Sequence, residues 1–340
     1  MIRSLVLATV YGILLWVASF SSPSPILVLL SEDQLARLVA PLRWLLALAL
    51  VREINAGLSC WAENKWLWTN DKNAWDWKSE VAVVTGGSNG IGAMVVKKLA
   101  SHGIKVAVLD VQPLSKELQN DEGNLIKLYK CDITCWRAVH AAGNAIRSDH
   151  GSPSILINNA GIGNANTILE VTPERLRTIF DVNLISHWNT VQEFLPDMIS
   201  KNKGHIMSTA SLAAFFGLAG MVDYSCTKAG LIAFHEGLSQ ELKHRYNAPK
   251  IKTSIVYPNW TKTRLITAIE KNISTTKAPL VDPTEVATTV VNHILRAKSG
   301  QLILGPQIVA SMRALPTWLQ ELVRDKLAQV VDVNATSAVA

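Results

Sequence analysis

The chain has 340 residues, 49% hydrophobic and 18% charged, so it is long enough for one large domain or two ordinary ones with a substantial apolar core. Its net charge of +6 comes from scattered Lys and Arg residues, without a basic run interleaved with aromatic rings, which argues against a nucleic-acid groove. Four irregularly spaced cysteines do not make a disulfide framework, and the sequence predicts no metal site.

The first 60 residues predict a hydrophobic membrane anchor. Residues 4–20 carry no charge and have the length of a short bilayer-spanning helix. After the breaker SSPSP, a second apolar stretch at residues 38–51 contains Pro41 and Arg43, which make it a weak candidate for a second span. A single span, a hairpin bent at SSPSP and a cleaved signal peptide are all compatible with this pattern, and we favour an uncleaved anchor.

Residues 61–79 form a tryptophan-rich linker, because five of the eleven tryptophans lie between Trp61 and Trp77. Tryptophan is enriched where a membrane meets water, since its ring is apolar and its N–H needs a partner. The same rings are equally suited to cover the base of the following domain. In either case the linker joins an anchor to a soluble body.

From residue 80 to residue 305, short β-rich runs alternate with longer amphipathic segments. This alternation predicts an α/β domain built on a doubly wound parallel sheet with helices on both faces. The expected strands are residues 81–85, 105–110, 125–131, 154–158, 205–209, 251–257 and 301–304.

The sequence TGGSNGIG, residues 85–92, follows the first of these strands and opens the first helical pattern. Glycines at that place allow a tight turn and a close approach of the backbone to a pyrophosphate at the N-terminus of a helix. The pattern therefore predicts a dinucleotide site. Its expected contact residues are Gly86, Ser88, Asn89, Gly90, Ile91 and Gly92.

Asp110 ends the second strand, at the distance from the glycines that is expected for an acid binding the adenosine ribose. Its carboxylate would accept from both ribose hydroxyls and repel a 2′-phosphate. The neighbours Val111 and Gln112 supply no cation to offset that repulsion. NAD is therefore favoured over NADP as the cofactor.

Several motifs together resemble the short-chain dehydrogenase/reductase family over residues 80–305. They are TGGSNGIG, Asp132 in CDIT, NNAG at 158–161, Asn183 in DVN, Ser211, and Tyr224 with Lys228 in YSCTK, in the family's order. The resemblance implies a Rossmann-type fold, oxidoreductase activity on alcohols or ketones, and a possible homodimer. Within the family, the layout resembles the membrane-associated branch of retinol and hydroxysteroid dehydrogenases.

Tyr224 and Lys228 lie four residues apart, one turn along the same face of a helix. A free tyrosine is a poor base at neutral pH, and a nearby cation stabilises its phenolate and lowers its pKa. The resemblance implies that Tyr224 exchanges the hydroxyl proton and that Lys228 also binds the nicotinamide ribose. It further implies that Ser211 holds the substrate oxygen and that Asn183 positions a water for a proton relay.

Other cofactor contacts follow from the same motifs. The resemblance implies that Asp132 meets the adenine amine and Asn158 lies beside the adenosine, while Thr261 and Thr263 contact the carboxamide side of nicotinamide. The family commonly has glycine where this chain has Asn259, which leaves the shape of that loop open. Asn259 also begins the glycosylation sequon NWT, and a glycan there would block the site, so we expect the catalytic domain to face the cytosol.

The expected substrate is a lipophilic alcohol or ketone, such as a retinoid, a steroid or another lipid. An apolar pocket is predicted from the residues between Ser211 and Tyr224, namely Leu212, Phe215, Phe216, Leu218 and Met221. Residues 264–284 fall where the family places a mobile segment over the substrate. Residues 306–340 predict an amphipathic segment and a tail, which caps the pocket, touches the membrane or does both.

The expected location is a membrane, at the endoplasmic reticulum or at the surface of a lipid droplet. Two alternative functions remain open. One is an NADPH-dependent reductase of lipid or polyketide ketones, against which Asp110 speaks. The other is a lipid-surface scaffold that retains the fold without activity, against which the set of Ser211, Tyr224 and Lys228 speaks.

Overall fold

The computed structural model describes residues 12, 32–68, 72–119, 123–267, 280–328 and 330–331. The chain divides into two compact units, Met1–Trp66 and Leu67–Ala340. The apolar stretch at residues 4–20, apart from Gly12, lies outside the described residues, as does the tail from residue 332.

In the first unit, the described residues form one long helix, α2 (Glu32–Glu63). The apolar stretch at 38–51, expected to be interrupted, lies within this helix, because its run of Leu and Ala residues favours helix strongly enough to continue past Pro41. Residues Arg43–Glu63 are long and apolar enough to cross a membrane. Arg52 and Glu53 lie near the middle of that range, where charged side chains are costly in a bilayer.

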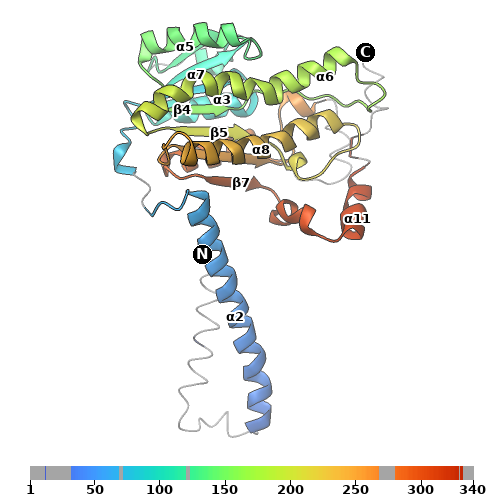
Figure 1. Ribbon diagram of the computed structural model, residues 1–340. Helices are drawn as coiled ribbons and strands as arrows, with labels where there is room; N and C mark the ends of the chain where they lie inside the picture. Colours follow the sequence, from blue (N-terminus) through green and yellow to red (C-terminus); the bar gives the residue numbers. More distant parts are fainter. Residues whose placement is uncertain are drawn as a thin grey trace. The chain divides into compact units, whose positions relative to one another are not determined.

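The second unit is built on a seven-stranded parallel sheet with the strand order β3-β2-β1-β4-β5-β6-β7 (Figure 1). The strands are β1 (Val81–Thr85), β2 (Lys105–Asp110), β3 (Ile126–Lys130), β4 (Ile155–Asn158), β5 (His205–Thr209), β6 (Lys252–Pro258) and β7 (Gly300–Leu304). Each expected strand is confirmed to within one residue at either end, because each is a β-rich run between polar or glycine-rich turns. The doubly wound α/β fold is thus confirmed.

Helices cover both faces of this sheet. The longer ones are α3 (Gly90–Ser101), α5 (Trp136–His150), α6 (Pro173–Phe180), α7 (Ser186–Lys201), α8 (Val222–His244) and α10 (Pro283–Leu295). Side chains of α3 and α10 share one apolar core with one face of the sheet. Side chains of α5, α7 and α8 share another core with the opposite face. The strand order reverses between β1 and β4, which in such sheets opens a crevice at the carboxyl ends of the strands.

The remaining elements of this unit are mostly short turns, with one further helix at the C-terminal end. They are η2 (Lys72–Ala74), α4 (Lys116–Gln119), η3 (Asp181–Ile185), η4 (Leu212–Ala214), η5 (Arg264–Ile266), η6 (Gln307–Ala314) and α11 (Thr317–Leu327). Local sequence sets several helix starts. Thr172 and Asp282 each cap a helix with a side-chain oxygen, and each is followed by a proline at the first helical position.

The second half of the tryptophan-rich linker belongs to the second unit. Trp75 is 8% exposed and packs in the core beside α3 and α10. Its ring stacks on that of Trp77 at 5.0 Å between centroids, and the Lys203 ammonium lies 4.9 Å from the Trp75 ring centre. Trp75 and Trp77 therefore cover the base of the sheet domain, as one of the two interpretations of the linker expected. Both lie within the second compact unit, which begins at Leu67.

Candidate active site

The glycine turn joins β1 to α3 and closes against neighbouring loops. Gly86 and Gly90 have φ angles of +62° and +58°, in the left-handed region that favours glycine. A Cβ atom on Gly86 would lie 2.8 Å from the Cα atom of Ala160, and one on Gly90 would lie 3.3 Å from Cγ2 of Thr263. Glycine therefore lets the turn at the N-terminus of α3 pack closely against the loops that follow β4 and β6.

Asn159 fixes this turn, a role that sequence reasoning missed. Its side-chain amide donates to the carbonyl oxygens of Thr85 and Gly86, both at 3.2 Å. Its backbone N–H donates to Oγ1 of Thr85 at 3.0 Å. The signal for this role was its place in NNAG, but the motif alone does not say which asparagine turns toward the glycines.

Asp110 is held beside the glycine turn by two backbone groups. The N–H of Ser88 donates to Oδ2 at 3.0 Å, and the N–H of Gln112 donates to Oδ1 at 2.9 Å. The hydroxyl of Ser88 donates to the carbonyl of Gln112 at 3.0 Å, so it is engaged within the protein. The carboxylate charge is thus fixed at the end of β2, next to the turn that would hold the pyrophosphate.

Asp132 and Asn158 occupy the ends of β3 and β4. Oδ1 of Asp132 accepts from the backbone N–H of Thr134 at 2.9 Å and from its hydroxyl at 2.7 Å, and the side chain is exposed. Asn158 is 2% exposed, and its Oδ1 accepts from Oγ1 of Thr190 at 2.8 Å. Its amide nitrogen is buried and has no hydrogen-bond partner among the described residues, which leaves a donor for a further group. These features fit a dinucleotide along the carboxyl edge of the sheet.

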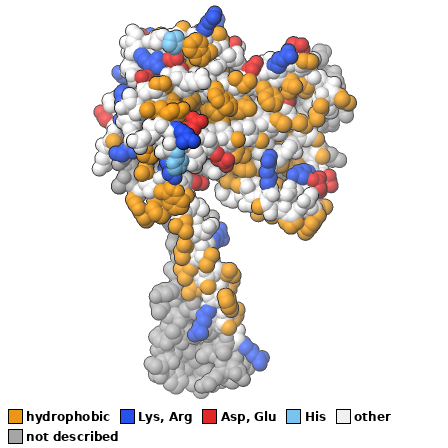
Figure 2. All heavy atoms as spheres, viewed as in Figure 1, with side chains coloured by type: hydrophobic (Ala, Val, Ile, Leu, Met, Phe, Trp, Pro, Cys, Tyr) orange, Lys and Arg blue, Asp and Glu red, His pale blue; other side chains and the backbone are white. Residues whose placement is uncertain are grey.

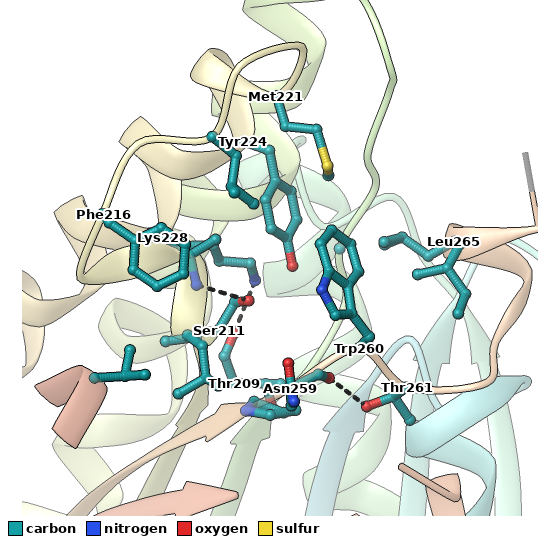
Figure 3. Close-up of a pocket in the computed structure, with 18 of the residues that line it drawn as sticks. Thr209, Ser211, Phe216, Met221, Tyr224, Lys228, Asn259, Trp260, Thr261 and Leu265 are labelled. Atoms are coloured by element: carbon teal, nitrogen blue, oxygen red, sulfur yellow. Dashed lines mark hydrogen bonds between the residues drawn. The ribbon is translucent and has the colours of Figure 1, made fainter. Parts of the chain in front are cut away.

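Three of the four predicted catalytic side chains line one cavity of about 420 Å³ (Figure 3). Ser211 follows β5, while Tyr224 and Lys228 lie on the first turns of α8. Nζ of Lys228 donates to the carbonyl oxygen of Thr209 at 2.8 Å. The structure therefore brings a phenol, a hydroxyl and an ammonium together in a largely apolar space.

Burial dominates the electrostatics of this cavity. It raises the pKa of Tyr224 to about 12, although the hydrogen bond with Ser211 acts in the opposite direction. It lowers the pKa of Lys228 to about 8. Nζ of Lys228 lies 5.5 Å from the centre of the Tyr224 ring. The lowered tyrosine pKa expected from the sequence is therefore not found in this form, because desolvation of the phenolate prevails.

Asn183 lies behind the cavity wall, in the π-helical turn η3 between α6 and α7. It is fully buried; Oδ1 accepts from the N–H of Ile162 at 2.8 Å, and Nδ2 donates to the carbonyl of Ile162 at 2.8 Å. A Cβ atom on Gly161 would lie 3.5 Å from Oδ1 of Asn183 and 3.6 Å from Nζ of Lys228. The asparagine and the lysine thus approach each other around Gly161, and the π-turn is the distortion that sets this orientation.

The loop after β6 lines another part of the cavity. Asn259 is not among the described residues with a positive φ, so the loop does not require the glycine that the family commonly has there. Oγ1 of Thr261 donates to the carbonyl of Asn259 at 2.8 Å, and Oγ1 of Thr263 donates to the carbonyl of Thr261 at 3.3 Å. Both threonines and Ile91 line the cavity.

Trp260 is a second residue that sequence reasoning missed. Its indole ring stands beside Tyr224 (Figure 3) and lines the cavity. The carbonyl of Trp260 accepts from the N–H of Val281 at 2.7 Å, and Thr261 pairs with Val281 in a parallel bridge. This bridge anchors the end of the expected substrate-covering segment, whose residues 268–279 lie outside the described ones.

The predicted apolar lining is largely present. Leu212, Phe216, Leu218 and Met221 line the cavity. Phe215 does not, and the expectation for this residue was wrong. Its ring lies 4.7 Å from that of Tyr257 and is buried in a separate core cluster, because the turn η4 directs it toward the sheet.

The C-terminal elements η6 and α11 close one side of the cavity. The lining side chains that they contribute are Ile308, Val309, Met312, Val323 and Leu327. Arg313 fastens η6 to the end of the turn η4 by donating to the carbonyls of Phe215 at 3.2 Å and Ala214 at 3.4 Å. The segment therefore caps the cavity, and its contact with a membrane stays a prediction.

Comparisons with known proteins agree with this geometry. The pattern of the family described as short chain dehydrogenase matches residues 80–274. Dehydrogenase RED2 of Cochliobolus heterostrophus is 45% identical over 205 residues, which cover 59% of this chain and 76% of that protein. Estradiol 17-beta-dehydrogenase 11 of Macaca fascicularis is 27% identical over 246 residues, which cover 71% of this chain and 80% of that protein.

A solved structure supports the fold alone. The ligand-free aldohexose dehydrogenase of Thermoplasma acidophilum matches with a TM-score of 0.56 at 22% identity, covering 67% of this chain and 92% of that one. Fold and family together define an NAD(P)-dependent oxidoreductase. The chain belongs to the short-chain dehydrogenase family, and its resemblance to the branch with retinol and hydroxysteroid dehydrogenases is confirmed.

Proposed function

We propose that this protein is a membrane-associated oxidoreductase that transfers a hydride between NAD(H) and a lipophilic alcohol or ketone. The observation that carries the proposal is the cavity itself, in which Ser211, Tyr224 and Lys228 meet a lining that is otherwise mostly aliphatic and aromatic. Such a lining offers few partners to a sugar or a phosphate. It suits a retinoid, a steroid or another lipid whose single reactive oxygen reaches Ser211 and Tyr224.

In this proposal, residues of the chain bind the substrate oxygen and transfer its hydroxyl proton. Ser211 donates a hydrogen bond to the substrate oxygen, and Tyr224 takes the hydroxyl proton during oxidation or returns it during reduction. Lys228 is mostly protonated at neutral pH, since its pKa is about 8, and its charge favours the phenolate. Asn183 positions a water between Lys228 and solvent. Bound NAD supplies the hydride acceptor.

NAD is proposed over NADP because the Asp110 carboxylate is held at the glycine turn by the N–H groups of Ser88 and Gln112. Gly86, Gly90, Gly92, Asn89 and Ile91 are proposed to contact the pyrophosphate side, and Asp132 and Asn158 the adenosine side. Thr261 and Thr263 are proposed to contact the nicotinamide side. Ser88 is proposed to act through its backbone, because its hydroxyl is engaged with Gln112.

The proposed location is a membrane of the endoplasmic reticulum or a lipid-droplet surface, with the catalytic domain toward the cytosol. The candidate span Arg43–Glu63 and the uncharged residues 4–20 support membrane attachment. Asn259 lines the cavity, so a glycan on its sequon would fill the space proposed for the substrate. A homodimer is also proposed, on the family resemblance alone.

The experiment is a substrate screen with the purified full-length protein. NAD reduction is followed with retinol, a hydroxysteroid, a long-chain alcohol and a sterol intermediate, with sugar alcohols and short alcohols as controls. We expect the highest kcat/KM for a lipophilic alcohol. The proposal fails if the protein neither reduces NAD with any alcohol nor oxidises NADH with the matching ketones and aldehydes.

A further inference from the structure

The cap over the cavity is apolar on two sides. Toward the cavity it presents Val323 and Leu327 of α11. Toward solvent it presents Trp318, which is 66% exposed, and Leu322, which is 52% exposed. Hydrophobic side chains accordingly lie at the surface of the lobe that carries α11 (Figure 2). A helix that only closed a pocket would need one apolar side.

The outward side chains form one stripe. Trp318, Leu322 and Lys326 are spaced four residues apart, so they follow one another along the same side of α11, and all three are exposed. An indole, an aliphatic side chain and a terminal ammonium match the boundary of a lipid layer, where rings lie at headgroup depth and lysine reaches phosphate. Ile308 of η6, which also lines the cavity, is 62% exposed and adds a further apolar side chain to the exposed surface of the cap.

We propose that the outer side of α11 and η6 docks on a lipid surface, and that the lipophilic substrate passes from that surface beneath this cap into the cavity. The inference rests on the proposed function. It commits to a lipid surface because the stripe ends in a cation that complements lipid phosphate, and because the substrate class proposed above partitions into lipid. Arg313 holds η6, and Gln320 of α11 donates to the carbonyls of Arg313 at 3.4 Å and Leu315 at 2.7 Å, so the two elements form one cap.

The test uses full-length protein in nanodiscs of phosphatidylcholine with anionic lipid. The variant Trp318→Ser/Leu322→Ser removes the apolar stripe without touching the cavity lining. Its control, Ile168→Ser/Leu169→Ser, removes side chains that are 72% and 97% exposed in a turn outside that lining. Equal melting temperatures of the two variants establish that both fold.

Amide hydrogen exchange across residues 317–327 is the primary readout. We expect slow exchange in the wild type and the control, and exchange about tenfold faster in the stripe variant, on the scale of losing two inserted apolar side chains. Equal exchange in all three proteins overturns the docking. Protection that follows protein concentration, at fixed lipid, also overturns it and assigns the surface to a second copy of the chain.

Kinetics test the passage of substrate. In the stripe variant, KM for a lipid-dissolved alcohol should rise about tenfold, with kcat unchanged and KM for a short soluble alcohol unchanged. An equal rise for both alcohols contradicts the proposed route. If the wild type oxidises no alcohol at all, the proposed function fails, whereas the exchange measurement still decides whether α11 docks on lipid.

Discussion

Asp110 is the side chain on which the choice of cofactor depends. Two backbone N–H groups fix the position of its carboxylate. The 2′-phosphate of NADP would therefore be repelled by a negative charge that cannot move away from it. We predict that NAD(H) binds at least about tenfold more tightly than NADP(H), the effect of about 1.4 kcal/mol of uncompensated repulsion. Calorimetric titration measures both affinities, and equal affinity or tighter NADP binding would contradict the assignment.

Two substitutions separate charge from shape at this position. Asp110→Asn keeps the size of the side chain and should reduce the preference for NAD. Asp110→Ser combined with Val111→Arg should move the preference toward NADP, because it replaces a repelling charge with an attracting one. An unchanged preference in both variants would assign the selectivity to another residue.

At single residues, the sequence predicted which side chains come together but not their pKa values or the directions of their rings. The spacing of Tyr224 and Lys228 predicts a shared helix face, and both side chains do line the same cavity. The pKa of Tyr224 was not predictable from that spacing, because it depends on how completely the cavity excludes water. Likewise, a run of apolar residues does not reveal that Phe216 turns toward the cavity while Phe215 turns toward Tyr257.

A buried polar chain connects β5, β6 and α10 at the amino end of the sheet. Oγ of Ser254 lies 2.9 Å from Nε2 of His205 and 3.0 Å from Nε2 of His293. Burial lowers the pKa of His293 to about 4. In the unfolded chain a histidine titrates near pH 6.5, so the unfolded state binds more protons below that value, and stability should fall as the pH drops from about 6.5 to about 4.

We predict that His293→Gln weakens this acid sensitivity, because glutamine can bond to Ser254 without gaining a proton. The melting temperature, measured at pH 7 and pH 5, should fall less in this variant than in the wild type. For a histidine with these two pKa values the difference is about 2 kcal/mol at pH 5. His244→Gln, at an exposed position, serves as the control; equal pH sensitivity in all three proteins would refute the role of His293.

The elements were predictable to different degrees. The seven strands follow from β-rich runs with clear ends, since few other structures suit such short apolar segments. The extent of α2 was underestimated, because Pro41 and Arg43 looked like interruptions and the helix continues through both. The sequence did not show that α11 has apolar side chains both toward the cavity and toward solvent. The periodicity of apolar residues gives the width of an apolar stripe, but it does not say what lies against each side of the helix.

The whole chain combines a catalytic unit with an apolar N-terminal unit, and we predict that residues 1–51 keep the protein on membranes without being cleaved. The protein should remain in the membrane pellet after a carbonate wash, and N-terminal sequencing should recover the original start. The reason is the length of uncharged and apolar sequence in that region, which water solvates poorly. A soluble product that begins near Phe20 would contradict the prediction and indicate secretion.

The central claim is that the Tyr224 phenol exchanges the substrate proton, and Tyr224→Phe tests it most directly. The change removes the hydroxyl and keeps the ring that packs in the cavity, so NAD affinity should stay nearly constant. General acid–base catalysis is worth typically about 10²–10⁴-fold, so kcat should fall by at least about 10²-fold. Tyr246→Phe, at an exposed tyrosine, should keep the wild-type rate. If Tyr224→Phe retains more than about a tenth of the wild-type kcat, the proton is exchanged elsewhere and the mechanism proposed for this cavity is wrong.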